Sequence, residues 1–150
     1  MAKYIKHDFF YPTTPGVVWE YLTDPELMAQ WLMKSNFEPV VGHEFQFRTN
    51  PHPDVNFDGT FYCKVLEVDP PKKLSYEWKF GSGDGVLHNS VVNWTLVETA
   101  GGTELQLIHN GFEKEALFLP LLASMETGWL RNMTKIFQLI TTAADGTAKA

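Results

Sequence analysis

The chain has 150 residues, of which 44% are hydrophobic and 20% charged, and this composition is typical of one globular domain. Its formal net charge is −6 without any basic cluster, so we expect neither a nucleic-acid partner nor binding to an anionic membrane. A lone cysteine, Cys63, excludes a disulfide framework. The chain has no apolar run near ~20 residues and no signal-peptide core in MAKYIKHDFF, so we expect a cytoplasmic protein.

The first 31 residues predict one strand followed by two short helices. Residues 3–11 are rich in aromatics and read as a strand. Thr14 is a helix-capping residue, and Pro15 suits the first position of the helix that follows. An apolar stripe supports that helix, formed by Val17, Val18, Tyr21 and Leu22. Asp24-Pro25 repeats the same start signal for a second helix that ends at Trp31.

Alternation of apolar and polar residues predicts about five further strands after Gly42. Breaks rich in Gly, Pro, Asp and Asn separate them, at TNPHPD (49–54), at Asp69-Pro70-Pro71, at GSGDG (81–85) and at ETAGG (98–102). The expected strands lie at 44–48, 57–68, 74–80, 86–97 and within TELQLIHNGF (103–112), where the strand finishes at His109. Because short turns join them, we expect them to pair as an antiparallel meander.

The last third predicts one long helix that begins near Pro120, since proline cannot lie deep inside a helix. Its apolar stripe steps by three and four residues, and we expect three more residues to widen it. The stripe is Met125, Trp129, Met133, Ile136 and Ile140, widened by Leu122, Leu130 and Phe137. Gly128 would cost about 1 kcal/mol relative to alanine inside this helix, so we expect a close backbone approach there.

This order of elements predicts an α+β fold in which a curved antiparallel sheet wraps around the long C-terminal helix. We expect one domain over residues 1–142 and a disordered tail over 143–150, where the sequence is small and polar. Space between sheet and helix would be closed at one end by the two short helices. A ligand-sized cavity is therefore expected there.

Several motifs, in this order and spacing, carry a resemblance to a known family over roughly residues 4 to 140. They are Pro15-Gly16-Val17-Val18-Trp19, Leu22-Thr23-Asp24-Pro25-Glu26 with Trp31, Val41-Gly42 before Phe45 and Phe47, Gly59, Val68-Asp69-Pro70-Pro71 with Leu74, Tyr76 and Trp78, Gly102-Thr103-Glu104-Leu105, His109-Asn110-Gly111-Phe112, and Gly128-Trp129. The chain resembles the START/Bet-v-1-like (SRPBCC) superfamily with its helix-grip fold. Within it, the chain is similar to the family of activators of the heat-shock protein 90 ATPase.

The resemblance implies the helix-grip fold and a range of functions. Relatives include carriers of hydrophobic ligands, aromatic polyketide cyclases, self-sacrificing resistance proteins and chaperone activators. In the eukaryotic activator, a domain of this type follows another domain that also engages the chaperone. Since one domain takes up these 150 residues, we expect no strong stimulation of the chaperone ATPase by this chain alone.

The motifs of metal and nucleophilic chemistry are missing from the sequence. Cys63 has no histidine near it in sequence, and a strand cysteine usually packs as a small hydrophobe. GSGDG is neither a nucleophile elbow nor a phosphate-binding loop, because it precedes a strand. The histidines have no metal-ligand spacing; they are His7, His43, His52, His88 and His109. We therefore expect no metal and no cofactor.

The candidate site is a set of large apolar residues with one histidine. Aromatic residues make up 14% of the chain, and wide rings either fill a core or line a cavity. His109 shares the inward face of its strand with Leu105 and Leu107. It is either a structural residue bonded to a carbonyl or tyrosine hydroxyl, or a polar anchor for a ligand, or an acid–base group. The expected ligand-binding residues are Trp31, Phe45, Phe47, Trp78, Trp94, His109, Met125, Trp129 and Met133.

Three functions remain open from the sequence. The first is non-enzymatic binding of a small hydrophobic or aromatic molecule in the cavity. The second is a stress-linked accessory module that acts on the heat-shock chaperone or on a homodimer partner. The third is a cyclase- or hydrolase-like enzyme that uses His109 and pocket tyrosines.

Overall fold

The computed structural model describes residues 4–48, 59–81, 87–111 and 119–144, with side chains except at 87, 88, 119–124, 143 and 144. Its helices are α1 (Pro15–Thr23), α2 (Pro25–Trp31) and α3 (Leu119–Ala144). Its strands are β1 (Tyr4–Tyr11), β2 (Glu44–Arg48), β3 (Thr60–Asp69), β4 (Lys73–Gly81), β5 (Leu87–Thr99) and β6 (Gly102–Asn110). Expectations for TNPHPD, for the GSGDG turn beyond Gly81, for the Leu122 side chain and for the tail from 145 lie outside the described residues.

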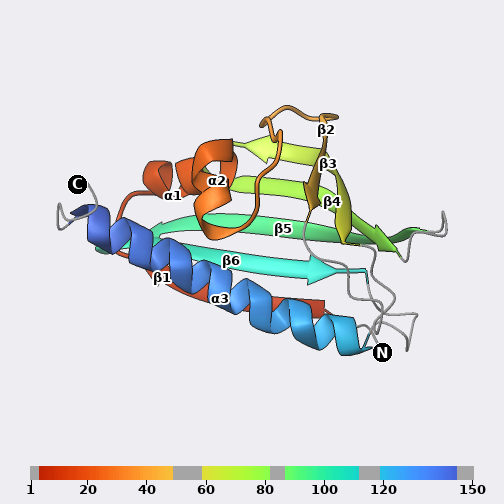
Figure 1. Cartoon of the computed structure of the whole chain (residues 1–150). Helices are drawn as coiled ribbons and strands as arrows, with labels where there is room; N and C mark the ends of the chain where they lie inside the picture. Colours follow the sequence, from red (N-terminus) through yellow and green to blue (C-terminus); the bar gives the residue numbers. More distant parts are fainter. Residues whose placement is uncertain (1–3, 49–58, 82–86, 112–118, 145–150) are drawn as a thin grey trace.

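The strands form one antiparallel sheet in the order β1-β6-β5-β4-β3-β2. Strands β2 to β6 follow one another as the predicted meander, and β1 pairs with β6 at the far edge. The long helix α3 crosses one face of this sheet, and α1 and α2 cover the same face near one end (Figure 1). The predicted α+β helix-grip fold is confirmed.

The first two helices begin where the sequence predicts. The side chain of Thr14 accepts a hydrogen bond from the backbone N–H of Val17 over 3.4 Å. Asp24 Oδ1 accepts one from the N–H of Glu26 over 2.9 Å. In both helices proline follows the cap, where its missing N–H costs nothing.

The inward face of the sheet packs on one side of α3. Along β6, Thr103, Leu105, Leu107 and His109 are buried and alternate with partly exposed residues. The five stripe residues predicted on α3 are all buried: Met125, Trp129, Met133, Ile136 and Ile140. The hydroxyl of Tyr11 on β1 donates to the carbonyl of Met133 over 2.8 Å, which fixes the helix against the sheet edge.

Two expectations about α3 are wrong. Leu130 does not widen the stripe: its side chain is 46% exposed, because one residue beyond Trp129 the helix has turned by about 100° away from the sheet. Gly128 makes no close approach, since a Cβ built there would meet nothing within 4 Å. Close approach occurs at Gly102 instead, where a Cβ would collide with the carbonyl oxygen of Tyr11 and the ring of Phe10.

Among the described helices, no stretch is both long and apolar enough to span a lipid bilayer.

Candidate functional site

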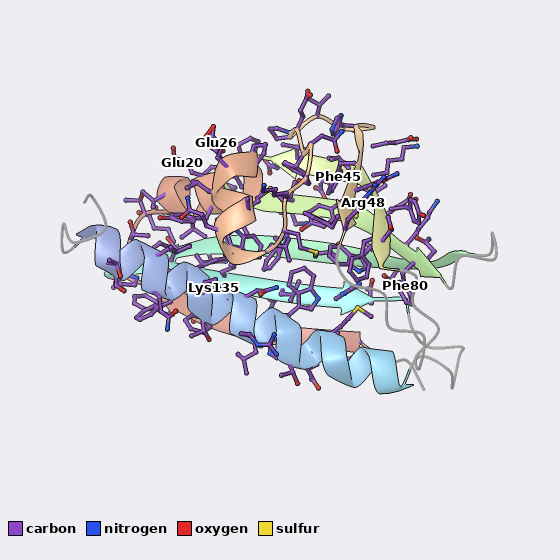
Figure 2. All side chains as sticks on the ribbon, in the orientation of Figure 1. Glu20, Glu26, Phe45, Arg48, Phe80 and Lys135 are labelled. Carbon is purple, nitrogen blue, oxygen red and sulfur yellow. The ribbon has the colours of Figure 1, made fainter. Side chains whose placement is uncertain are left out.

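A continuous series of aromatic rings fills the space between the sheet and the helices; we call it the aromatic interior. It starts at Trp31 on α2 and runs through Trp94 on β5, Trp129 on α3, Trp78 on β4 and Phe47 to Phe45 on β2. Successive ring centroids lie 6.1, 5.5, 5.3, 5.3 and 5.4 Å apart. Figure 2 shows side chains crowding the space between α3 and the sheet. Five elements far apart in sequence therefore contribute to one cluster.

The structure brings all nine predicted ligand-binding residues into this interior. Each of them is at most 9% exposed, and six of them form the ring series above. His109 lies beside two rings of the series, with its own ring centroid 5.7 Å from that of Trp78 and 5.9 Å from that of Trp129. Met125 and Met133 lie one helical turn before and after Trp129.

Two hollows occur in the described part of the chain. One, of about 610 Å³, lies over β2, β3 and β4 and is lined mainly by polar side chains of the outward sheet face, among them Glu44, Tyr62, Lys64 and Lys79. The other, of about 570 Å³, lies at the end of the sheet near Pro15, Pro71 and Leu96. Neither hollow includes His109 or any tryptophan, and Phe45, at the end of the ring series, is its one member that borders the first of these two hollows.

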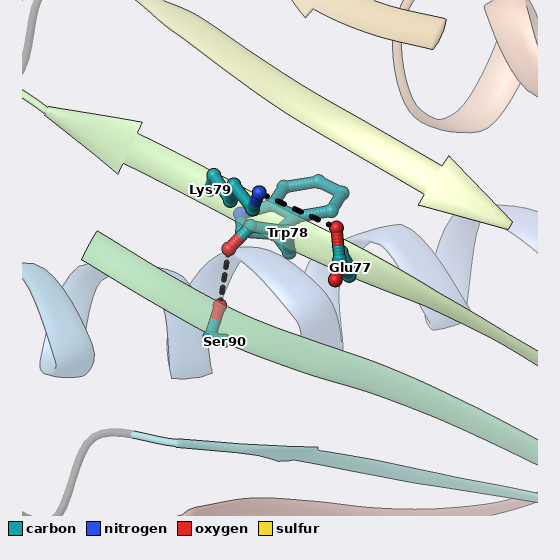
Figure 3. Close-up of polar contacts among 4 residues, drawn as sticks. All are labelled: Glu77, Trp78, Lys79 and Ser90. Carbon is teal, nitrogen blue, oxygen red and sulfur yellow. Dashed lines mark hydrogen bonds and ion pairs between the residues drawn. The ribbon is translucent and has the colours of Figure 1, made fainter. Parts of the chain in front are cut away.

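His109 is the centre of a hydrogen-bond network that joins three elements. Trp129 Nε1 lies 3.0 Å from Nδ1 of His109, and His109 Nε2 lies 2.8 Å from the hydroxyl of Ser90 on β5. That hydroxyl donates to the carbonyl of Trp78 over 2.6 Å, as Figure 3 shows. An indole can only donate and the serine proton is already used, so Nδ1 is the acceptor and Nε2 carries the proton. The ring is therefore the neutral Nε2–H tautomer.

Burial lowers the pKa of His109 from 6.5 to about 3. The direction agrees with the geometry, because a second proton on Nδ1 would face the N–H of Trp129, donor against donor. A group used for acid–base catalysis near neutral pH works best with a pKa close to that pH. The structure therefore favours the structural and anchoring interpretations of His109 over the catalytic one.

Trp78 differs from the other buried tryptophans because its indole N–H has no partner among the residues that the structure describes. Its Nε1 is buried and makes no hydrogen bond to the part of the chain that the structure describes. The N–H groups of Trp31 and Trp94 donate to the carbonyl of Tyr21 and to the hydroxyl of Tyr76, over 2.6 and 3.0 Å. Since buried polar groups nearly always have a partner, the lone N–H of Trp78 needs an explanation.

Further residues, not predicted from the sequence, complete this region. Ser90, Tyr76 and Tyr11 provide its hydrogen bonds, and Phe37 and Phe61 extend its ring contacts. Strand alternation could have placed Ser90 inward with Val92 and Trp94. It could not have shown that His109 would lie opposite Val92, within reach of Ser90.

The described residues give no support to nucleophilic or metal chemistry. Cys63 is buried, and desolvation together with the nearby charge of Glu77 raises the pKa of its thiol, so it lacks the thiolate that a nucleophile needs. Glu77 pairs with Lys79 over 3.5 Å, and both lie on the sheet face opposite Trp78 (Figure 3). In residues 4–48, 59–81, 87–111 and 119–144, no three His, Cys, Asp or Glu side chains gather as metal ligands would.

Comparison with known families gives a match to the one described as Activator of Hsp90 ATPase homolog 1-like protein, over residues 12–141. The chain belongs to this family. The match runs from the start of α1 to residue 141 in α3 and includes every ring of the aromatic interior.

Solved structures with the same fold include protein MLL2253 from Mesorhizobium loti, with a TM-score of 0.81 and 31% identity over 93% of this chain and 97% of that one. DynU16 has a TM-score of 0.74 and 23% identity over 93% of this chain and 48% of its own. Protein BH1534 from Bacillus halodurans has a TM-score of 0.72 and 24% identity over 93% and 99%. The last two likenesses show the fold alone. Comparison with curated protein sequences gives no match.

Proposed function

We propose that the protein binds a small hydrophobic or aromatic molecule in the aromatic interior, between the sheet and α3. The observation that carries this proposal is the buried indole N–H of Trp78, which nothing in the described chain satisfies. A buried donor without an acceptor costs about 1–3 kcal/mol, so an internal group of this kind is more typical of a binding site than of a finished core.

The chemistry of the surrounding side chains supports an apolar guest. The buried residues of the described chain are hydrophobic apart from Thr23, Ser75, Ser90, Thr103 and His109, and none of them is charged under neutral conditions. Small-molecule sites are commonly lined by aromatic side chains with a few polar groups that fix orientation. Here the polar groups would be Trp78 and the His109 network.

The rim of the interior has one adaptable residue. Met125 is 9% exposed, the largest fraction among the buried hydrophobic residues that the structure describes, and it precedes Trp129 by one turn. Methionine is flexible and tolerates different packing partners. We expect Met125 to move when a molecule enters beside Trp129.

The test begins with native mass spectrometry of the freshly purified protein, followed by a thermal-shift screen of neutral aromatic compounds. We expect a bound mass or a saturable rise in melting temperature. Met125→Ala should change the affinity for a hit, whereas Leu130→Ala, on the exposed side of the same helix, should leave it unchanged. Absence of any ligand in both assays, or equal effects of the two variants, would contradict the proposal.

A second candidate follows from the family description, which names activation of the Hsp90 ATPase. In this second proposal, the chain would bind the Hsp90 chaperone and act as its accessory protein. A saturable, several-fold rise in chaperone ATP turnover would support this function. Unchanged turnover at saturating concentration, with no complex in a pull-down, would remove it.

A further inference from the structure

We infer that the molecule bound in the aromatic interior is neutral, flat and aromatic, and that it carries a carbonyl-type acceptor which pairs with the Nε1–H of Trp78. This inference rests on the proposed function and names its ligand class.

The hydrogen-bond inventory requires an acceptor on the ligand. Indole nitrogen is a donor only, so a hydroxyl proton or an ammonium group could not pair with Trp78. The indole donors of Trp31, Trp94 and Trp129 are already directed to Tyr21, Tyr76 and His109. Among these buried tryptophans, Trp78 alone has a donor that the described chain leaves unused.

The His109 network cannot supply the missing acceptor without breaking. Nδ1 of His109 accepts from Trp129, and the hydroxyl of Ser90 accepts from Nε2 while it donates to the carbonyl of Trp78. The network thereby holds the Trp129 ring and the Trp78 backbone in place. His109 and Ser90 are positioning residues in this arrangement.

The charges favour a neutral ligand. None of the buried side chains of the described chain is a lysine, arginine, aspartate or glutamate. Burial holds His109 neutral, with its pKa lowered, so it offers no positive charge to a carboxylate. An ion would lose its hydration here without gaining a partner, which is costly in a low-dielectric interior.

The ring contacts favour a flat shape. Trp78 is surrounded by rings whose centroids lie between 4.4 and 5.7 Å from its own, those of Phe61, Phe47, Trp129 and His109. Phe61, the nearest of these rings, is 7% exposed, so the interior beside Trp78 comes close to the surface. A flat aromatic molecule that replaces the contact of Phe61 would stack on the indole and place its acceptor at the indole edge.

The experiment compares two flat tricyclic probes that differ only in the acceptor, 9-fluorenone and fluorene, by calorimetric titration. We expect the wild type to bind fluorenone about tenfold or more tightly than fluorene, because a single hydrogen bond to an otherwise unpaired group is worth roughly this factor. In Trp78→Phe the ratio should fall to about one. The carboxylate probe fluorene-9-carboxylate should bind the wild type more weakly than fluorenone.

Trp94→Phe is the matched control, because its N–H already has an internal acceptor. That variant should lower the affinities for both probes together and keep their ratio. If Trp78→Phe does not fold, replacing Trp78 with β-(3-benzothienyl)alanine keeps the shape of the ring and removes only the N–H. The ratio should again fall to about one.

The outcomes separate the inference from the proposed function. Equal binding of fluorenone and fluorene by the wild type, or a ratio that survives removal of the Trp78 N–H, overturns the acceptor inference and leaves binding in place. Tighter binding of the carboxylate overturns the neutral ligand class. If neither probe binds and the broader screen also finds nothing, both the inference and the proposed function are wrong.

Discussion

The indole N–H of Trp129 on α3 donates to Nδ1 of His109 on β6 over 3.0 Å, and this bond joins the C-terminal helix to the strand next to the β1 edge of the sheet. It also fixes which nitrogen of His109 is protonated: Nδ1 accepts, so Nε2 carries the proton and donates it in a hydrogen bond to the hydroxyl of Ser90 on β5. A histidine that sequence alternation places inward is thereby satisfied on both sides. Its neutral form is part of the fold.

We predict that stability falls with decreasing pH through His109. Its folded pKa lies near 3 and the unfolded value near 6.5, so between these values the unfolded chain takes up a proton that the folded chain refuses. Neutral His109 makes its full contribution to the free energy of unfolding above about pH 7. At about pH 5 that free energy should be lower by about 2 kcal/mol. Urea titrations of wild type and His109→Gln across this range measure it.

Other titrating groups occur in both proteins and cancel when the two unfolding free energies are subtracted. The wild-type advantage over His109→Gln should therefore shrink as the pH falls. Parallel curves for the two proteins would show that His109 titrates normally and lies in a wetter site than the structure indicates.

Ser90→Ala should destabilise the protein by about 1–3 kcal/mol, because it removes the hydroxyl that accepts a hydrogen bond from the buried Nε2–H of His109. For a chain of this size we expect a loss of roughly 2–4 °C in melting temperature per kcal/mol. Ser75→Ala is the matched control: Ser75 is a buried serine on the neighbouring strand β4 but points to the opposite sheet face. Equal losses in the two variants would mean that the His109 network adds no stability.

Sequence periodicity predicted the fold and the position of His109, because both depend on which side of an element a residue faces. Leu105, Leu107 and His109 share one face of β6 for that reason, and so do Met125, Trp129 and Met133 on α3. The hydrogen bonds could not be predicted in the same way. His109 meets Trp129 only because α3 passes close to the His109 end of β6. Where a helix passes over a strand depends on the packing of the whole interior.

The two errors on α3 have the same origin. A list of apolar residues does not show how wide a face the sheet covers, so Leu130 was included in the stripe although it lies outside the covered side. Likewise, a glycine in a helix does not show whether anything approaches it. At Gly128 nothing does, and the close approach lies at Gly102, where β1 and β6 pair.

Gly128→Ala should stabilise the protein by about 1 kcal/mol, since alanine has a much higher helix propensity and the new methyl group meets open space. Gly102→Ala should destabilise it, because the methyl group would strike backbone at Tyr11. Thermal melts of both variants test the pair. A lower melting temperature for Gly128→Ala would reveal a neighbour of α3 that the structure does not show.

Met133→Asp should cost several kcal/mol, because the side chain of Met133 is fully buried against the sheet and a carboxylate there would have no partner. The helix cannot easily rotate to relieve it, since Tyr11 holds the carbonyl of the same residue. Leu130→Asp introduces the same charge one turn earlier on the exposed side of α3, where we expect a change within about 0.5 kcal/mol. Chemical unfolding of the two variants decides between them. Similar free energies of unfolding for the two variants would mean that α3 does not turn the Met133 side toward the sheet, contrary to the packing described above.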